Sequence, residues 1–180
     1  MKIYTIGHST RGMDELIALL RESRIDLLVD IRSVPRSRFN PQFNTEALPE
    51  PLREAGIAYR HIKALGGLRH RPKDAPPSPN TGWRNDAFRN YSDYALTAAF
   101  RDGLAELRGL AAEHCSAIMC AEAVWWRCHR RIVADYLLAE AVEVRHIMGP
   151  GKAEPARLTP GAVVRSDNTI IYPAAQGHLI

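Results

Sequence analysis

Short apolar runs alternate along the chain with longer segments in which apolar residues recur at helical spacing. Each run ends at glycine, proline or polar residues, as is typical of buried β-strands. Five mostly apolar runs of six residues have this pattern, at 2–7, 26–31, 57–62, 115–120 and 142–147. They predict five strands.

The segments between these runs predict helices. In 13–22 the leucines share one helical face and acidic residues occupy the first turn, where negative charge is favourable. We expect Ser9 or Thr10 to cap this helix. Further helices are expected at 45–55, once or twice within 85–112, and at 125–139, where Arg127 and Arg131 would share a face.

Strands that alternate with helices indicate a mostly parallel sheet built from βαβ units. The sequence therefore predicts a single-domain α/β fold with a mostly parallel five-stranded central sheet and flanking helices. We expect the α/β domain at 1–150 and a C-terminal extension at 151–180, packed on the same domain and containing a small hairpin. Because crossovers between parallel strands are right-handed, the carboxyl ends of all five strands should lie at one edge.

The composition is that of an ordinary globular protein. Of the 180 residues, 46% are hydrophobic and 24% are charged, which suits one domain with a substantial core. No apolar stretch approaches the roughly 20 residues that span a bilayer, and the first residues lack a signal-peptide pattern. We therefore expect a cytoplasmic protein with no membrane partner, in which Cys115, Cys120 and Cys128 stay reduced.

Arginine dominates the basic residues. Only four of the 24 Lys and Arg residues are Lys, and the formal net charge is +4. A guanidinium group binds carboxylate or phosphate through two parallel hydrogen bonds, so this usage favours anionic partners. A GC-rich genome produces the same bias, and the local clusters of arginine are therefore more informative than the total.

Polar and ionisable residues follow each predicted strand. Ligands of open α/β sheets bind outside the carboxyl ends of the strands, so residues in these positions are candidates for a site. In chain order the candidates are His8, Ser9 and Thr10; Arg32, Ser33, Arg36, Ser37 and Arg38; His61, Lys63, Gly66 and Gly67; Cys120, Glu122, Arg127, Cys128, His129, Arg130 and Arg131; and His146. We expect them to meet at a common mouth.

Several of these residues have a purely structural alternative. Asp30 and Arg32 alternate along a strand, so their side chains point the same way and form an ion pair if both are buried. His8 is either a general base or ligand, or a residue that caps the next helix. Trp125 and Trp126 either stack on a planar ligand or pack in the core.

The segment 120–131 contains a dense group of ionisable and nucleophilic side chains. Cys120 ends a strand and precedes several arginines, which would lower its pKa and make it a nucleophile; alternatively it is a small buried residue. Glu122 is a candidate acid or base, or neutralises an arginine. Cys128 follows Cys120 by eight residues and stands beside His129, a wider spacing than the roughly two to four residues usual in metal sites.

Four spaced motifs stand out along the chain. They are Gly-His-Ser at 7–9, Asp-Ile-Arg-Ser-Val-Pro-Arg-Ser at 30–37, Leu-Gly-Gly at 65–67, and Cys-Ala-Glu with Cys-His-Arg within 120–130. Together they resemble the domain-of-unknown-function family 488, over residues 3 to about 146, which implies a cytosolic α/β domain with no assigned reaction. By this resemblance the marked positions are Gly7, His8, Ser9, Asp30, Arg32, Pro35, Ser37, Gly66, Gly67, Cys120, Glu122, Cys128, His129 and Arg130.

Our leading hypothesis is an enzyme, a hydrolase or transferase, that binds a phosphorylated or nucleotide-like anion at the carboxyl edge of the sheet. In this hypothesis proton transfer or nucleophilic attack comes from His8, Cys120, Glu122 and His129. The substrate is bound by Ser9, Arg32, Arg36, Ser37, Arg38, Lys63, Gly66, Gly67, Arg127 and Arg130.

Two other function classes stay open. One is a nucleic-acid-binding module that uses the Arg-rich loop 32–38 and the two tryptophans, Trp125 and Trp126. The other is a metal-binding protein with Cys120, Cys128, His129 and His8 as ligands. The residues indicate no particular cofactor and no oligomeric state.

Overall fold

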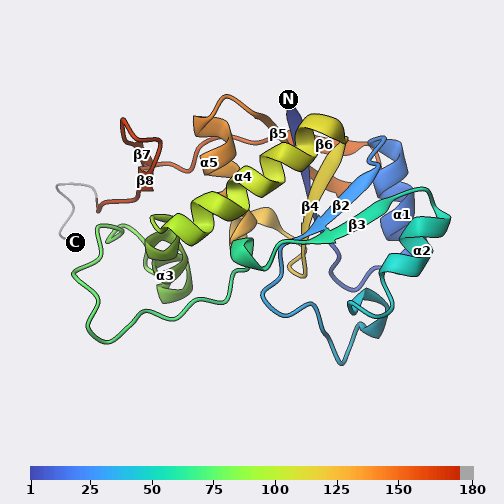
Figure 1. Cartoon of the computed structure of the whole chain (residues 1–180), viewed down its shortest axis with the longest axis horizontal. Helices are drawn as coiled ribbons and strands as arrows, with labels where there is room; N and C mark the ends of the chain where they lie inside the picture. Colours follow the sequence, from blue (N-terminus) through green and yellow to red (C-terminus); the bar gives the residue numbers. More distant parts are fainter. Residues whose placement is uncertain (175–180) are drawn as a thin grey trace.

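A six-stranded sheet forms the centre of the computed structural model, which describes residues 1–174 (Figure 1). The strand order is β3–β2–β4–β1–β5–β6, and all neighbours are parallel except β5 and β6. The predicted α/β class and the five predicted strands are confirmed. The strands are β1 (Lys2–Gly7), β2 (Leu27–Asp30), β3 (Ala58–His61), β4 (Ser116–Cys120), β5 (Glu143–Gly149) and β6 (Lys152–Pro155).

The sheet contains one strand that the sequence did not predict. β6 follows a tight turn in which Gly151 adopts a φ of +67°, and it pairs with β5 at the edge of the sheet. Its sequence, KAEP, has no alternation of apolar residues, and most of it is exposed. An edge strand forms ladder hydrogen bonds on one side only and tolerates proline, so it need not have an apolar signature.

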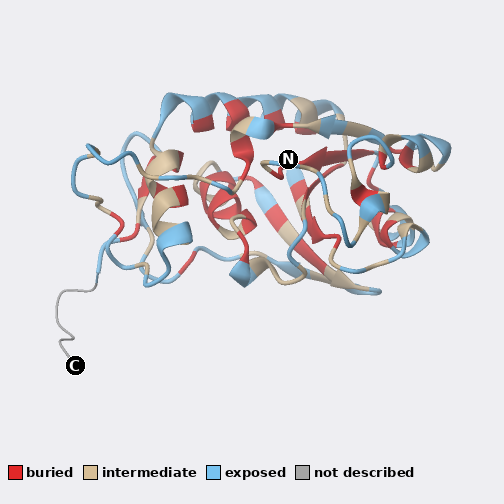
Figure 2. Ribbon diagram, turned by 90° about the horizontal axis from the view of Figure 1, so that it is seen from below, coloured by how far each residue is buried: buried red, intermediate tan, exposed pale blue. Residues whose placement is uncertain are grey.

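Helices cover both faces of the sheet (Figure 1). One face carries α1 (Met13–Glu22) and α2 (Pro49–Glu54), and the other carries α3 (Asp86–Ala95), α4 (Ala98–Glu113) and α5 (Arg130–Ala139). We call these the α1 face and the α5 face. Successive strand residues enter different cores, since Ile118 packs on the α5 face and Met119 on the α1 face. Buried residues concentrate on the strands and on the inner sides of the helices (Figure 2).

The predicted helix at 125–139 begins five residues later than expected, at Arg130. A short 3-10 turn, Trp125–Arg127, comes first, and Cys128 then adopts an extended conformation that interrupts the helix. The sulfur of Cys128 accepts the backbone N–H of Arg130, which satisfies one of the free donors at the start of α5. The expectation that Arg127 and Arg131 share a helical face is therefore wrong.

The start of α1 also differs from the prediction. Its N-cap residue is Gly12, and neither Ser9 nor Thr10 caps it with a side chain. Ser9 instead adopts a φ of +50°, and its backbone N–H donates to the carbonyl of Ala121. The chain after β1 is therefore bonded to the loop after β4 before it turns into the helix.

The predicted C-terminal hairpin is confirmed as β7 (Val163–Val164) paired with β8 (Ile170–Ile171). It packs on α5, where the hydroxyl of Tyr136 bonds to the backbone of β8. The hydroxyl of Tyr172, after β8, donates to the buried carboxylate of Asp135. These buried polar contacts bind the hairpin to the α5 face.

Residues 175–180, the end of the predicted extension, lie outside the described residues. Within 1–174, none of the helices combines the length and the apolar character needed to cross a membrane.

Gly7 lies so close to the loop after β4 that a side chain has no room. A Cβ atom here would lie 1.9 Å from the backbone carbonyl oxygen of Glu122. We predict that Gly7→Ala lowers the free energy of unfolding, measured in urea, by more than about 2 kcal/mol. The control is Gly109→Ala in α4, where the new Cβ meets no atom within 4 Å and should add up to about 1 kcal/mol. Equal effects in the two variants would contradict the close approach.

Candidate functional site

The carboxyl ends of the parallel strands meet at one edge of the sheet. Gly7 at the end of β1 is level with Cys120 at the end of β4, and Asp30 at the end of β2 is level with His61 at the end of β3. The backbone N–H of His8 donates to the carbonyl of Cys120 at 2.9 Å. The loops that carry the predicted site residues are therefore neighbours.

The predicted site residues nevertheless form two groups, one on each face of the sheet. On the α1 face, the ring of His8 stacks on Phe43 with centroids 4.3 Å apart. On the α5 face, Cys120 lies against His129, the residue before α5. We call the first group the edge cleft and the second the thiol cluster. The predicted residues therefore do not meet at one mouth, and the edge of the sheet carries two adjacent groups of them.

The edge cleft is a cavity of about 320 Å³ between the loops that follow β1, β2 and β4. Two guanidinium groups, three hydroxyls, an amide, an imidazole and a carboxylate form its polar lining. The residues that supply them are His8, Ser9, Thr10, Arg32, Arg36, Ser37, Asn40 and Glu122. Seven of these eight, all but Asn40, are among the candidates named from the sequence.

Arg32 forms a buried ion pair with Asp30, so this structural alternative is confirmed. Its Nη2 and Nε lie 2.6 and 2.9 Å from the carboxylate oxygens, and the two side chains are 6% and 0% exposed. The hydroxyl of Tyr59 donates to the same carboxylate, and burial beside it raises the pKa of Tyr59. Since Nη2 also donates to the carbonyl of Phe43, only Nη1 is left to face His8.

His8 is engaged at both ring nitrogens. Its Nδ1 bonds to the carbonyl of Ser9 at 2.9 Å, and its Nε2 lies 3.2 Å from Nη1 of Arg32. Because carbonyls only accept and guanidinium groups only donate, Nδ1 carries the proton and Nε2 accepts. Burial, together with the charge of Arg32, lowers the pKa of His8 to about 4. In this arrangement neither nitrogen is free to take a proton from a ligand.

The loop after β4 forms one wall of the edge cleft. The backbone carbonyl of Glu122 accepts from Nη2 of Arg130 and packs against Gly7. These contacts fix the backbone and leave the side chain of Glu122 exposed at the cleft. Among the described residues that line the cleft, it is the one acidic side chain.

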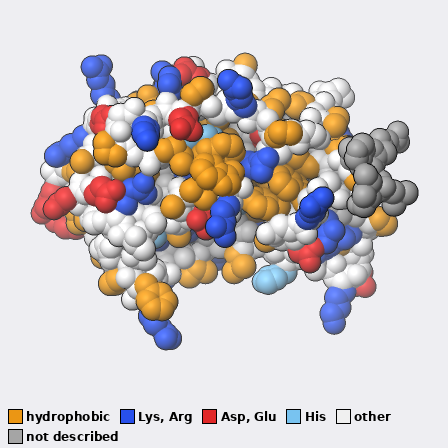
Figure 3. Space-filling model, turned by 180° about the vertical axis from the view of Figure 1, so that it is seen from behind, with side chains coloured by type: hydrophobic (Ala, Val, Ile, Leu, Met, Phe, Trp, Pro, Cys, Tyr) orange, Lys and Arg blue, Asp and Glu red, His pale blue; other side chains and the backbone are white. Residues whose placement is uncertain are grey.

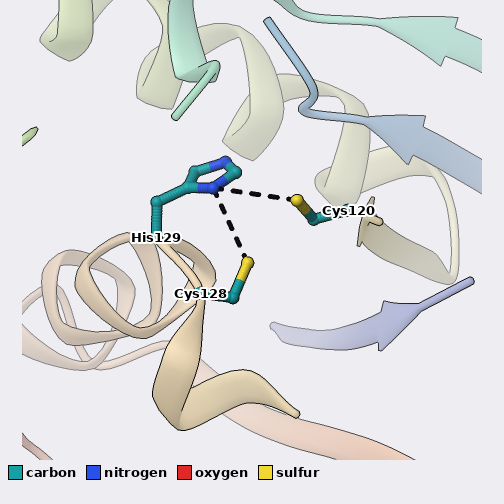
Figure 4. A group of neighbouring side chains, drawn as sticks. All are labelled: Cys120, Cys128 and His129. Atoms are coloured by element: carbon teal, nitrogen blue, oxygen red, sulfur yellow. Dashed lines mark hydrogen bonds between the residues drawn. The ribbon is translucent and has the colours of Figure 1, made fainter. Parts of the chain in front are cut away.

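The thiol cluster consists of Cys120, Cys128 and His129 (Figure 4). The Nδ1 atom of His129 lies 3.8 Å from Sγ of Cys120 and 3.6 Å from Sγ of Cys128. Across the ring, Nε2 donates to the carbonyl of Ile31 at 3.0 Å. Since a carbonyl can only accept, Nε2 carries a proton, and Nδ1 is the ring nitrogen that faces the two sulfurs.

Arg130 is buried beside the thiol cluster, with 1% of its surface exposed. Its Nε donates to Sγ of Cys128 at 3.3 Å, and its backbone N–H lies 3.5 Å from the same sulfur. Within residues 1–174 it forms no ion pair with a carboxylate. Because a buried cation without a counter-charge is costly, this arrangement favours the thiolate form of Cys128.

The two thiols of the cluster titrate in opposite directions. The neighbouring Cys128, together with burial, raises the pKa of Cys120. Burial opposes ionisation of Cys128, but the neighbouring Cys120, His129 and Arg130 lower its pKa well below the ordinary value. The lowered pKa that we expected at Cys120 is therefore found at Cys128.

The glycines of the Leu-Gly-Gly loop allow close packing on both β2 and the cluster. A Cβ atom on Gly66 would lie 2.5 Å from Oγ of Ser33, and one on Gly67 would lie 2.3 Å from Nδ1 of His129. The ring of Tyr91 contacts the imidazole at a centroid distance of 5.0 Å. Together these neighbours hold the ring of His129 in place.

Other predicted binding residues lie outside both groups. Arg38, Lys63 and Arg127 are exposed, and within residues 1–174 their side chains make no polar contact with either group. Arg36 lines the edge cleft and pairs with the carboxylate of Glu46.

The two tryptophans differ in their surroundings. Trp125 stacks on the buried ring of His146 with centroids 4.4 Å apart, which favours the core alternative, whereas Trp126 is 46% exposed. Figure 3 shows one face of the molecule, on which Lys and Arg side chains lie apart from one another around a central apolar area. No single basic surface dominates that face.

Sequence reasoning did not identify Phe43, Asn40 or Tyr91. The loop after β2 contains two phenylalanines, and nothing in the sequence separates Phe43, which is fully buried against His8, from Phe39, which is 92% exposed. A larger, mainly apolar groove of about 560 Å³ lies between the segment 68–79 and α3, away from both groups.

The buried ion pair predicts a large penalty for removing one partner. In Asp30→Asn the guanidinium of Arg32 stays buried without its counter-charge, so the free energy of unfolding should fall by about 3–5 kcal/mol. The control is Glu106→Gln, which removes the exposed partner of Arg60 and should cost less than about 1 kcal/mol. Similar losses in both variants would show that the Asp30 carboxylate is not needed as a buried counter-charge.

His146 predicts a loss of stability in acid. Burial lowers the pKa of His146 to about 4, and its Nδ1 bonds to Thr5 at 2.8 Å. The folded chain therefore binds this proton only near pH 4, whereas the unfolded chain binds it near pH 6.5. As the pH falls through this window, the wild type should lose up to about 3 kcal/mol that His146→Gln does not lose. Urea denaturation of both proteins across the window measures the difference; parallel curves would refute it.

The model of one protein family, described as "Domain of unknown function DUF488", matches residues 12–137. That range contains the loop after β2, the Leu-Gly-Gly loop and the thiol cluster, and it begins after His8. Searches of curated proteins and of solved structures find no match. Since the family model covers more than half of the sequence, the resemblance seen in the motifs is confirmed, and the chain belongs to the DUF488 family.

Proposed function

We propose that this protein is an enzyme, a hydrolase or transferase, that binds a small phosphorylated or nucleotide-like anion in the edge cleft. The observation that supports it is the convergence of side-chain hydrogen-bond donors from two chain segments, 8–10 and 32–40, on a cavity of about 320 Å³. The cavity lies at the carboxyl edge of a parallel sheet, where α/β proteins usually bind ligands.

Arg36 is the cation of the cleft that an anion can reach, and the carboxylate of Glu122 lines the same cleft. Arg32 is balanced by Asp30, so the charge available to a ligand comes mainly from Arg36. Arg36 and its partner Glu46 are 71% and 63% exposed, and an ion pair in water contributes little free energy. A phosphate in the cleft can therefore replace the carboxylate of Glu46 at small cost.

Uncharged donors complete the binding surface. The hydroxyls of Ser9 and Thr10 line one side of the cleft, and Ser37 and Asn40 line the other. The Oγ atom of Ser37 accepts the backbone N–H of Asn40, which orients its hydroxyl proton away from that bond. These groups suit the several acceptor oxygens of a phosphoryl group.

Glu122 is the group that we assign to proton transfer. Its carboxylate lines the cleft on a loop whose backbone is fixed, whereas both nitrogens of His8 are occupied. A general acid or base must lie within hydrogen-bonding reach of the bound substrate, and Glu122 meets this condition for any ligand that fills the cleft. His8 then acts as a positioning residue that orients Arg32.

The proposal is tested by calorimetric titration with inorganic phosphate, nucleoside mono- and diphosphates, and sugar phosphates. The wild type should bind at least one of them, and Arg36→Gln should bind it about tenfold more weakly because one charge-assisted hydrogen bond is lost. The control is Arg60→Gln, which removes an exposed, ion-paired arginine far from the cleft and should leave the affinity unchanged.

Turnover separates an enzyme from a binding protein. Glu122→Gln should keep the affinity for the ligand and lower its turnover by about 100-fold or more. If no ligand of the panel binds the wild type, or if Arg60→Gln weakens binding as much as Arg36→Gln, the anion site is wrong. If the ligand binds and Glu122→Gln turns it over at the wild-type rate, the assignment of Glu122 is wrong.

A further inference from the structure

We propose that the thiol cluster is a metal site, in which Cys120, Cys128 and His129 bind one thiophilic divalent transition-metal ion, Zn²⁺ foremost, and leave its fourth position open. This site goes beyond the proposed anion enzyme. It uses none of the residues that line the edge cleft and lies on the opposite face of the sheet.

The sulfur–nitrogen distances fit tetrahedral coordination. Bond lengths of about 2.3 Å to sulfur and about 2.0 Å to nitrogen at tetrahedral angles place sulfur and nitrogen about 3.6 Å apart. The Nδ1 atom of His129 lies 3.6 Å from Sγ of Cys128 and 3.8 Å from Sγ of Cys120. All three candidate ligand atoms lie within 4.8 Å of one another, and the two sulfurs would lie about 3.8 Å apart around a bound ion. The three ligands thus converge from two elements, and a small shift of the sulfurs suffices to hold an ion.

The imidazole is oriented as metal-binding histidines usually are. Its outer nitrogen, Nε2, donates to the carbonyl of Ile31, and this bond directs Nδ1 at the two sulfurs. Gly67 packs on the ring, and the edge of Tyr91 contacts it from another side. A histidine that served only as core filler would not need its second ring nitrogen turned toward two thiols.

The surroundings of Cys128 also suit a bound thiolate. Its sulfur accepts hydrogen bonds from Nε and from the backbone N–H of Arg130, as the ligands of protein metal sites commonly do from their outer shell. Two thiolates, one divalent ion and the guanidinium of Arg130 carry a net charge of +1. The fourth position therefore favours water, hydroxide or a small anion.

The burial of the ligands leaves the site within reach of an ion. Cys128 is buried, while Cys120 and His129 are partly exposed at the edge of the sheet. Sites with three protein ligands and an open position are the catalytic type, as opposed to closed structural sites with four. Among residues 1–174 the group has three such members, which is the number that an open site requires.

The test uses Co²⁺ as a spectroscopic probe of the reduced, full-length chain. After treatment with reductant and chelator, followed by removal of both, the wild type should bind one Co²⁺ per chain. The spectrum should show the intense visible bands of tetrahedral cobalt and a thiolate-to-cobalt charge-transfer band. Added Zn²⁺ should abolish these bands, because zinc binds such sites more tightly than cobalt.

Three variants locate the site. Cys120→Ser and His129→Gln should each weaken Co²⁺ binding by more than about 100-fold, since loss of an outer-shell partner alone costs about 10- to 100-fold. Cys128→Ser should weaken Co²⁺ binding to the same extent. Because Cys128 is buried, circular dichroism must first show that this variant is folded. If it is not folded, the Cys120→Ser variant, which changes a partly exposed residue, provides the test. The matched control is Cys115→Ser, because this third thiol contacts the carbonyl of Ser23 away from the cluster.

Three results would overturn the metal site. They are a wild type that shows no cobalt bands, a Cys115→Ser variant that loses the bands, and a folded Cys120→Ser variant that keeps them with full affinity for Co²⁺. A disulfide between Cys120 and Cys128 that persists under the reducing conditions and blocks cobalt also overturns it. Arg36→Gln should leave cobalt binding unchanged, so failure of the anion proposal and failure of the metal site are read from different experiments.

Discussion

The buried guanidinium of Arg130 is the group on which both candidate sites depend. On one side it donates to the sulfur of Cys128, and on the other to the backbone carbonyls of Glu122 and Ala123. Inside a protein no water molecule can take the place of a missing partner, so the guanidinium group and the acceptors around it depend on one another for their hydrogen bonds. A single side chain thus contacts both the sulfur of Cys128 in the thiol cluster and the loop that forms one wall of the edge cleft.

The alternation of side chains along a strand explains why one sheet edge carries two sites. His8 and Cys120 are bonded through their backbones, yet their side chains leave opposite faces of the sheet. His8 joins Phe43 and the ion pair of Arg32 on the α1 face, whereas Cys120 meets α5 on the other. Residues that the sequence predicts to form one site are therefore separated by the thickness of the sheet.

Much of this architecture follows from local pattern and chirality. The apolar runs and the right-handed crossovers bring the strand ends to one edge. The two-residue spacing of Asp30 and Arg32 along a strand also predicts their ion pair. The sequence did not predict on which face of the sheet each loop residue lies, because this depends on contacts between segments that are distant in the chain. The start of α5 depends on the sulfur of Cys128, and the thiol cluster on a tertiary approach that its eight-residue spacing does not reveal.

The peptide between Ile31 and Arg32 belongs to both sites. The carbonyl of Ile31 accepts from His129 in the thiol cluster, while the side chain of Arg32 contacts His8 in the edge cleft. A displacement of this short segment changes the geometry on both faces at once. Consecutive residues at the end of β2 therefore contact both candidate sites, so their backbone positions fix the separation of the two groups across the sheet.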